Sequence, residues 1–370
     1  MRIYLDHASA TPLRPEALIA ERATQEVFAS PLSVHWAGRA ARTHLENARF
    51  KLAGAFGLPP RNLIFTSGAS EANSLAILGT MLGFAGGHLL TTQIEHSSVL
   101  GAARAWERLG NPVTYLAPDS QGRIEPQAVA AALRPDTRLV SIGWANSETG
   151  NIAPMAEISA LVHSRGAYLH SDAALAWGIV QPELVDLLSL SSPKLGGPRA
   201  SGLLYRKSEV NIFPLIYGAG EQGERGGSEN LTGVAGFAAA ALTARSSWAR
   251  EALQMAALRE RLEAGLLRIE GTQINGDLAN RLPQISNVTV RGVDGEALAL
   301  NLDLLGVAVS AGSACSSGSL EPSHVLLAMG KSAQEARASL RFSLAASTSE
   351  SEIDLVLAAF SEAVQTSRLN

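Results

Sequence analysis

The chain has 370 residues, of which 46% are hydrophobic and 17% are charged, and its formal net charge at pH 7 is −4. This composition excludes a largely disordered protein, and the length predicts two domains rather than one small core. Lysines and arginines are scattered singly, so the sequence gives no electrostatic signal for nucleic-acid binding. The most apolar run, residues 234–243, is far too short to span a membrane, and Asp6 interrupts the apolar start where a signal peptide would continue.

Short β-rich runs alternate with helical patterns through the first two thirds of the chain. The predicted strands cover residues 62–66, 88–93, 113–117, 139–144, 167–171, 184–189 and 202–205. The helices predicted between several of them cover residues 70–82, 98–109, 126–132 and 155–164. This alternation predicts an α/β fold with a mainly parallel sheet and helices on both faces. In such sheets, functional groups gather at the carboxyl ends of the strands.

The pattern changes after Asn230. A long helical stretch is predicted over residues 231–267, with a break near Ser246. Two short strands at 285–290 and 307–310 and a C-terminal helix near 350–367 follow it. We interpret this part as a linker helix and a smaller α+β domain. The predicted division gives residues 15–245 to a large domain, and residues 1–14 with 246–370 to the small one.

The run Thr-Ser-Gly-Ala-Ser at residues 66–70 follows a predicted strand and opens a predicted helix. Backbone N–H groups at such a helix start form an anion site together with the Ser70 hydroxyl. The same run also fits an ordinary capped turn with Ser70 as the N-cap. Because it is short and lacks a Walker lysine, the run alone leaves both interpretations open.

Asp172 and Lys194 follow two successive predicted strands. Asp172 ends a very apolar strand, where a carboxylate is either a helix N-cap or the partner of a buried cation. Lys194 lies in a turn rich in glycine and proline, where a lysine is normally a solvated surface residue. If both strands belong to one parallel sheet, the two side chains open onto the same crevice. That is the geometry required by a Schiff-base lysine and a carboxylate that keeps a pyridinium nitrogen protonated.

Cys315 is the single cysteine of the chain, and it lies within the small-residue run Ser-Ala-Gly-Ser-Ala-Cys-Ser-Ser-Gly-Ser at 310–319. Two glycines in this run permit positive φ angles, so we expect a surface loop that carries a reactive thiol. The alternative is an idle, half-buried cysteine in a turn. One cysteine excludes an intramolecular disulfide, and a free thiol is typical of the reducing cytosol. A soluble cytoplasmic protein is therefore expected.

Nine short motifs occur in the order in which the pyridoxal-phosphate cysteine desulfurases carry them, over about residues 2 to 362. They are Tyr-Leu-Asp-His-Ala-Ser-Ala-Thr-Pro at 4–12, Phe-Thr-Ser-Gly-Ala-Ser-Glu at 65–71, Glu95 with His96, Asn-Ser-Glu-Thr-Gly at 146–150, Asp172, Ser191 with Lys194, Arg-Gly-Gly-Ser-Glu-Asn at 225–230, Ser-Ala-Cys-Ser at 313–316 with Leu-Glu-Pro-Ser at 320–323, and Arg-Phe-Ser-Leu at 341–344. Each motif is weak alone, but nine in one order are highly specific. The chain closely resembles this family, and the cysteine loop resembles its iron–sulfur and nitrogenase-type branch.

The resemblance implies a homodimer of PLP fold type I, with a seven-stranded sheet in the large domain, and it assigns cofactor roles. Lys194 would hold pyridoxal 5'-phosphate as a Schiff base, Asp172 would bind the pyridine nitrogen, and Asn146 would touch the ring hydroxyl. The groups implied for the phosphate are Ala69, Ser70, Ser191 and, from a second subunit, Ser228.

The same resemblance assigns roles around the substrate. His96 would stack on the cofactor ring and shuttle protons. Arg341, with Asn146, would bind the substrate, because the guanidinium fork suits a carboxylate. Cys315 as a thiolate would attack the sulfur of the bound cysteine, leaving alanine and a Cys315 persulfide. The alternatives are that His96 only caps a helix and that Arg341 only forms a surface ion pair.

The chain departs from the family pattern at several positions. Pro193 stands where the family has the histidine that precedes the lysine, and Leu175 stands where it has a glutamine. Ser30 replaces an asparagine, and the stretch 218–224 is one residue shorter than expected. Losing the two hydrogen bonds expected from positions 193 and 175 costs about 1–3 kcal/mol of cofactor binding. That corresponds to about one to two decades of affinity.

The resemblance predicts a cysteine desulfurase, a transferase that converts L-cysteine to L-alanine. It would pass the sulfur to an acceptor or scaffold protein for iron–sulfur clusters or thio-modification. No metal ion, nucleic acid or membrane partner is expected. Two alternatives stay open. One is a selenocysteine lyase or another β-eliminating enzyme on the same scaffold. The other, which Pro193 and Leu175 keep open, is a degenerate desulfurase paralogue that acts as a sulfur-relay or binding partner.

Overall fold

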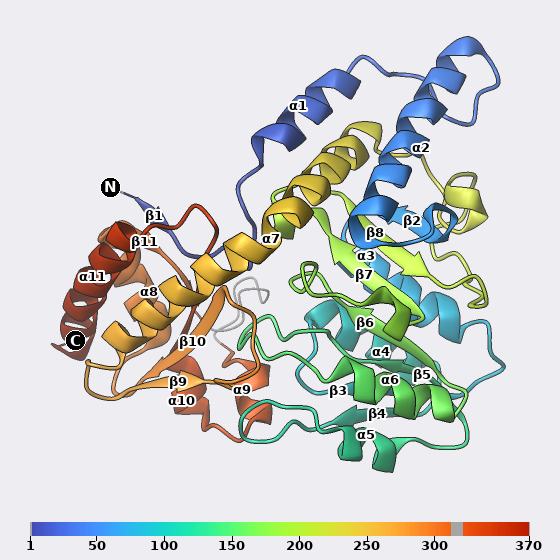
Figure 1. Cartoon of the computed structure of the whole chain (residues 1–370). Helices are drawn as coiled ribbons and strands as arrows, with labels where there is room; N and C mark the ends of the chain where they lie inside the picture. Colours follow the sequence, from blue (N-terminus) through green and yellow to red (C-terminus); the bar gives the residue numbers. More distant parts are fainter. Residues whose placement is uncertain (1, 312–320, 370) are drawn as a thin grey trace.

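The computed structural model describes residues 2–311 and 321–369, and a seven-stranded sheet forms its larger part (Figure 1). The sheet order is β2-β8-β7-β6-β5-β3-β4. The strands are β2 (Leu63–Thr66), β3 (His88–Thr92), β4 (Val113–Leu116), β5 (Thr137–Ser141), β6 (Tyr168–Asp172), β7 (Leu187–Ser191) and β8 (Gly202–Arg206). β8 runs opposite to the other strands of this sheet, which are all parallel to one another. The predicted mainly parallel sheet is therefore confirmed.

Consecutive apolar residues in the strands point to opposite faces of this sheet. Because side chains alternate along a strand, neighbouring apolar residues must enter different cores. The pairs that divide in this way are Leu63 and Ile64, Leu90 and Leu89, Val140 and Leu139, Leu188 and Leu187, and Leu203 and Leu204. The first member of each pair packs with α2 (Trp36–Phe56), α5 (Pro126–Ala132), α6 (Met155–Ser164) and the start of α7 (Leu231–Leu266). The second packs with α3 (Ala69–Ser74), its π-helical continuation (Leu75–Gly79) and α4 (Ser97–Arg108).

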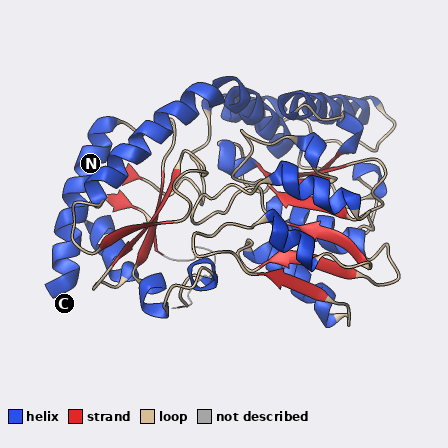
Figure 2. Cartoon of the chain, turned by 60° about the horizontal axis from the view of Figure 1, so that its bottom comes forward, coloured by secondary structure: helices blue, strands red, loops and turns tan. Residues whose placement is uncertain are grey.

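A smaller unit of two sheets lies at the other end of α7, as Figure 2 shows. Its antiparallel sheet has the order β12-β13-β10-β9, formed by β9 (Thr272–Asn275), β10 (Ile285–Val290), β12 (Ser310–Ala311) and β13 (Ser339–Ser343). A second, parallel pair joins β1 (Ile3–Tyr4) to β11 (Val307–Ala308). α8 (Gly295–Leu304), α11 (Glu350–Leu369) and the second half of α7 cover this unit and share its apolar core. The remaining helices are α1 (Pro15–Thr24), α9 (His324–Ala328) and α10 (Ala333–Arg337).

α7 runs without a break past the point where the sequence predicted one (Figure 1). Ser246 and Ser247 donate their hydroxyl hydrogens to the carbonyls of Thr243 and Ala244 one turn earlier. Serines that bond back in this way remain compatible with a helix. The proposed domain boundary at residues 245 and 246 falls inside α7, and it stays a prediction.

Other boundaries also differ from the predicted ones. β7 begins three residues later than predicted, because Pro182–Leu184 forms a 3-10 turn instead of a strand. The predicted strand at 307–310 is two strands, β11 and β12, which belong to different sheets. The long helix α2 was not predicted at all, although Gly57 ends it in a left-handed conformation (φ 68°). Among the described residues, no helix is long and apolar enough to cross a membrane.

A fully buried histidine in the large sheet makes the stability of the protein depend on pH. His170 lies between Ser141 and Ser189, with ring nitrogens 2.9 and 3.0 Å from their hydroxyl oxygens. Burial lowers the pKa of His170 to about 4. The unfolded chain therefore binds a proton on this ring at a higher pH than the folded chain does. Its contribution to stability is complete above about pH 6.5 and is lost as the pH falls toward 4.

We predict that wild-type protein loses about 3 kcal/mol of unfolding free energy from this group between pH 6.5 and 4, relative to His170→Gln. Urea titrations at several pH values measure this difference. Burial raises the pKa of Glu95 to about 7, which gives an opposite trend, but that trend is common to both proteins. His44→Gln, on the exposed face of α2, is the control and should follow wild type. Parallel curves for wild type and His170→Gln would contradict the prediction.

Candidate active site

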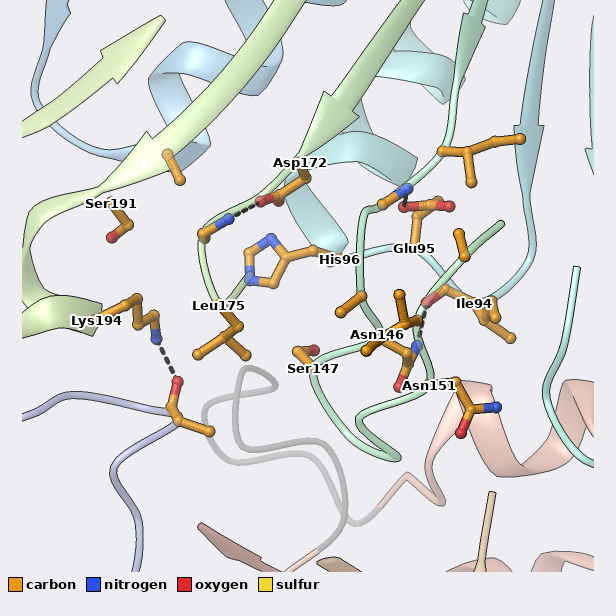
Figure 3. Close-up of a pocket in the computed structure, with 18 of the residues that line it drawn as sticks. Ile94, Glu95, His96, Asn146, Ser147, Asn151, Asp172, Leu175, Ser191 and Lys194 are labelled. Carbon is orange, nitrogen blue, oxygen red and sulfur yellow. Dashed lines mark hydrogen bonds between the residues drawn. The ribbon is translucent and has the colours of Figure 1, made fainter. Parts of the chain in front are cut away.

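A cavity of about 320 Å³ lies where the carboxyl ends of the parallel strands meet the smaller unit. Residues that end or follow β2, β3, β5, β6 and β7 line it, and Figure 3 labels several of them, among them His96, Asp172 and Lys194. Arg341 of β13, the segment at Ala8 and Ser9, and residues 122–124 after β4 also contribute to the wall. Eight of the ten predicted site residues line this cavity: Ala69, Ser70, His96, Asn146, Asp172, Ser191, Lys194 and Arg341. Ser228 is exposed and is not among the lining residues, and Cys315 lies outside the described residues.

One end of the cavity is a close-packed turn formed by residues 66–70. The turn rests directly on β8, because a Cβ atom at Gly202 would lie 2.5 Å from the Cα of Gly68. The N-cap of α3 is Gly68. The alternative in which Ser70 serves as the N-cap of an ordinary turn is therefore wrong. The turn is held by Glu71, whose carboxylate accepts the Ser67 N–H at 2.8 Å and pairs with Arg225 at 2.8 Å.

Asp172 lies at the end of β6, in the wall of the cavity. Its Oδ1 accepts the backbone N–H of Ala174 at 2.9 Å, and its Oδ2 accepts the side-chain amide of Asn73 at 2.6 Å. Both contacts fix the orientation of the carboxylate. In the view of Figure 3, the ring of His96 lies between Asp172 and Leu175.

Lys194 enters the cavity from the 3-10 turn Ser192–Leu195 that follows β7. Its Nζ donates to the carbonyl oxygens of Ala8 at 2.6 Å and Ser9 at 2.5 Å. The amine thus lies at the seam between the large sheet and the N-terminal segment. Asp172 and Lys194 open onto one cavity, as the order of the strands predicted.

Arg341 is buried and bridges three parts of the chain. Nη2 donates to Asp6 Oδ1 and to Ser9 Oγ, both at 2.8 Å, and Nη1 donates to the carbonyl of Ser147 at 3.0 Å. It is therefore not the surface ion pair that was one alternative. Its Nε has no hydrogen-bond partner among the described residues, and a buried donor in that state calls for an acceptor.

Asn146 is oriented by the backbone around it. Its Oδ1 accepts the N–H groups of Glu148 and Thr149, each at 2.9 Å, and its Nδ2 donates to the carbonyl of Ile94 at 2.9 Å. One amide hydrogen remains for the cavity.

Glu95 is a carboxylate in the cavity wall that received no role from the sequence. Burial raises its pKa to about 7, although the Thr92 hydroxyl at 2.7 Å and the Gly143 N–H at 2.9 Å favour the charged form. Asn73 and Ser98, which lie behind the cavity wall, were also missed. A spacing of 25 residues between an asparagine on one helix and a serine on the next gives no signal in the sequence.

Comparison with known proteins places the chain in a family. Residues 3–356 match the class-V aminotransferases. A cysteine desulfurase IscS from Dictyoglomus turgidum is 40% identical over 364 residues, covering 96% of this chain and 92% of the relative. A solved NifS-like protein superposes with a TM-score of 0.93 at 31% identity, over 99% of this chain and all of that one. A structure described as SspA in complex with cysteine has a TM-score of 0.81 at 31% identity, covering 93% of this chain and 99% of that one.

The fold is thus that of the class-V aminotransferases, which depend on pyridoxal 5'-phosphate. Within that class, the chain belongs to the pyridoxal-phosphate-dependent cysteine desulfurase family.

The donor set of the cavity fits this cofactor. The close-packed turn at 66–70 presents backbone N–H groups and the Ser70 hydroxyl, which suit a phosphate. The carboxylate of Asp172, held by two N–H donors, suits a protonated pyridine nitrogen. Lys194 supplies the amine that such cofactors need. Leu175 also lines the cavity, and it offers only an apolar side chain there.

We predict that Gly202→Ala lowers the affinity for pyridoxal phosphate at least about tenfold, a loss of about 1.4 kcal/mol. The added methyl meets backbone atoms of Gly68 at 2.5 Å, so the turn that suits the phosphate must move. Titration of the apoprotein, followed by cofactor absorbance, gives the dissociation constant. The matched control is Gly101→Ala on the exposed face of α4, where a Cβ meets nothing within 4 Å. The control should keep its affinity, and an unchanged affinity in Gly202→Ala would refute the assignment of the turn.

Proposed function

We propose that the protein is a cysteine desulfurase that converts L-cysteine to L-alanine and takes the sulfur onto Cys315 as a persulfide. In this step the Cβ–S bond of the substrate breaks and an S–S bond forms to Cys315. The substrate sulfur and the Cys315 sulfur are each oxidised by one unit, and the substrate Cβ is reduced by two units as it gains the hydrogen that makes alanine. Cysteine and one thiol thus give alanine and one persulfide, with no other reactant needed.

The observation that carries this proposal is how the described residues on either side of segment 312–320 attach to the cavity. Before the segment, Ser310 of β12 pairs with Arg341 in the antiparallel sheet. After it, His324 donates from Nε2 to the carbonyl of Glu95 at 3.0 Å, and the Ser323 hydroxyl donates to the buried carboxylate of Glu148. The described residues that flank Cys315 in the sequence are therefore attached to Arg341 on one side and to Glu95, in the cavity wall, on the other.

The roles proposed for the other residues follow from their contacts. Bound pyridoxal phosphate supplies the electron sink that the chemistry requires. Lys194 would hold it covalently, Asp172 would keep its ring nitrogen protonated, and Asn146 would donate its remaining amide hydrogen to the ring. Arg341 would donate from Nε to the substrate carboxylate while Asp6 and Ser147 hold the guanidinium in place.

A homodimer is part of the proposal, with Ser228 of one subunit contributing to the phosphate site of the other. Ser228 is exposed and outside the cavity of its own chain. The segment that carries it is anchored by two ion pairs, Arg49 with Glu221 at 3.0 Å and Arg225 with Glu71 at 2.8 Å. The protein is further proposed to act in the cytoplasm and to pass its sulfur to an acceptor protein for iron–sulfur clusters or thio-modification.

We predict that Cys315→Ser keeps the cofactor and binds L-cysteine but loses alanine production by at least about two orders of magnitude, because the attacking thiolate is gone. Alanine release and mass spectrometry of the protein after L-cysteine treatment are the measurements. Wild type should gain one sulfur on the peptide that contains Cys315, and the variant should gain none. Lys194→Ala is the companion variant, and it should retain no cofactor that borohydride can fix.

The outcomes separate the alternatives. Normal alanine production by Cys315→Ser would replace the desulfurase by a directly eliminating enzyme. A strong preference for selenocysteine would identify a selenocysteine lyase. If the wild-type protein neither binds the cofactor nor releases alanine, the result would favour a degenerate paralogue that acts as a sulfur-relay or binding partner.

We also predict that Leu175 and Pro193 loosen the cofactor. Purified protein should be partly free of it and gain activity on its addition, and Leu175→Gln combined with Pro193→His should tighten binding by about one to two decades. Equilibrium dialysis measures the affinity. Full occupancy after extensive dialysis, with no gain from the double variant, would argue against the prediction.

A further inference from the structure

Behind the cavity wall, a partly buried hydrogen-bond chain joins two of the groups that would hold the cofactor. It runs from Asp172 on β6 through Asn73 on α3 and Ser98 on α4 to His96. The Asn73 amide nitrogen lies 2.6 Å from Asp172 Oδ2 and 2.9 Å from Ser98 Oγ. Ser98 Oγ lies 2.7 Å from His96 Nδ1. Neither Asn73 nor Ser98 is part of the proposed catalytic set.

The carboxylate of Asp172 fixes the orientation of the Asn73 amide in this chain. An ionised carboxylate only accepts, so the atom of Asn73 that faces it must be the amide nitrogen. The same nitrogen faces Ser98 Oγ, which therefore accepts the second amide hydrogen. Asn73 is fully buried and its Oδ1 has no partner among the described residues. The Asn73 amide keeps this orientation, although it leaves Oδ1 without a partner in the described part of the chain, because the charge-assisted bond from its nitrogen to Asp172 is stronger than a bond between neutral groups.

The chain then fixes the tautomer of His96. The backbone N–H of Ser98 makes Nδ1 an acceptor, so in the 2.7 Å contact between Nδ1 and Ser98 Oγ the hydroxyl is the donor. The backbone N–H of Ser98 also donates to Nδ1, at 3.2 Å, so that His96 caps α4 while it lines the cavity. A ring nitrogen that receives two donors carries no hydrogen of its own.

We propose that Asn73 and Ser98 are positioning residues that lock neutral His96 in the Nε2–H tautomer, so that it offers a hydrogen-bond donor rather than a base to the bound cofactor and substrate. The catalytic meaning of this tautomer rests on the proposed function, because the Nε2–H would serve as a donor only when cofactor and substrate are bound. Proton uptake by His96 at Nδ1 would reverse the Ser98 hydroxyl and displace the Ser98 N–H. The locked tautomer therefore limits the proton shuttle that the resemblance assigned to His96.

The test reads the tautomer directly, by long-range ¹H–¹⁵N correlation spectra of holoprotein labelled with ¹⁵N-histidine at about pH 8, above the ordinary range of histidine ionisation. The protein has eight histidines, and the His96 signals are those that disappear in His96→Gln. Wild type should show the Nε2–H pattern. Ser98→Ala should raise the Nδ1–H fraction by about fivefold, the equivalent of one hydrogen bond.

Three further variants make the test specific. Ser98→Thr keeps the hydroxyl and should restore the wild-type pattern, while Ser97→Ala, on the neighbouring exposed residue, should leave it unchanged. Asn73→Leu frees the lone pair on Ser98 and should change the tautomer ratio in the direction of Ser98→Ala. An Nδ1–H pattern in wild type, or no change in Ser98→Ala, would overturn the proposal. Failure of the proposed desulfurase reaction is distinguishable, because the tautomer is measured without turnover.

Discussion

Arg341 is the contact on which the site depends, because it is the point where three distant parts of the chain meet. Its guanidinium joins β13 of the small sheet to Asp6 and Ser9 near the N-terminus and to Ser147 after β5 of the large sheet. A planar fork with five donors can make three directional bonds at once and still keep Nε for an acceptor in the cavity. A lysine at this position could not hold all three segments in register.

Arg341 shares the task of holding the N-terminal segment in the site with the pairing of β1 to β11 and with the bond from the Ala8 N–H to the Ser343 hydroxyl. Ala8 and Ser9 line the cavity, and their carbonyls accept from the amine of Lys194. These two acceptors lie about 185 residues from the lysine in sequence. The large sheet alone therefore supplies a lysine and a carboxylate, whereas the environment of the lysine comes from the segment that Arg341 holds. This explains how a cavity built mainly on parallel strand ends comes to depend on both ends of the chain.

The strands and most of the site could be predicted from the sequence because they depend on local patterns. Short continuous apolar runs predict strands that are buried on both faces, and motifs that follow such strands gather at one edge of the sheet, as Asp172 and Lys194 do. Contacts between side chains on different helices leave no such pattern. Asn73 and Ser98 are ordinary helix residues in the sequence, and only the packing of α3 against α4 brings them together. For the same reason, the buried ion pair of Arg49 and Glu221 could not be predicted, because the two residues are 172 positions apart. The sequence also predicted a helix break near Ser246 that the continuous helix α7 does not have.

In the segment that carries Ser228, an ion pair rather than apolar packing holds the backbone conformation. Glu221 and Gln222 have positive φ angles of 36° and 59°, a conformation that costs non-glycine residues about 1–3 kcal/mol each. Around them are glycines, which offer no side chains to pack. The carboxylate of Glu221 instead accepts from the buried Arg49 guanidinium and from the backbone N–H of Phe65 at 2.9 Å. Removing one partner of such a buried pair would leave an uncompensated charge at a cost of about 3–5 kcal/mol, so the loop conformation that keeps Glu221 on Arg49 is strongly favoured over one that separates them. The loop is thus specified by an ion pair anchored on β2, the strand that leads into the turn at 66–70.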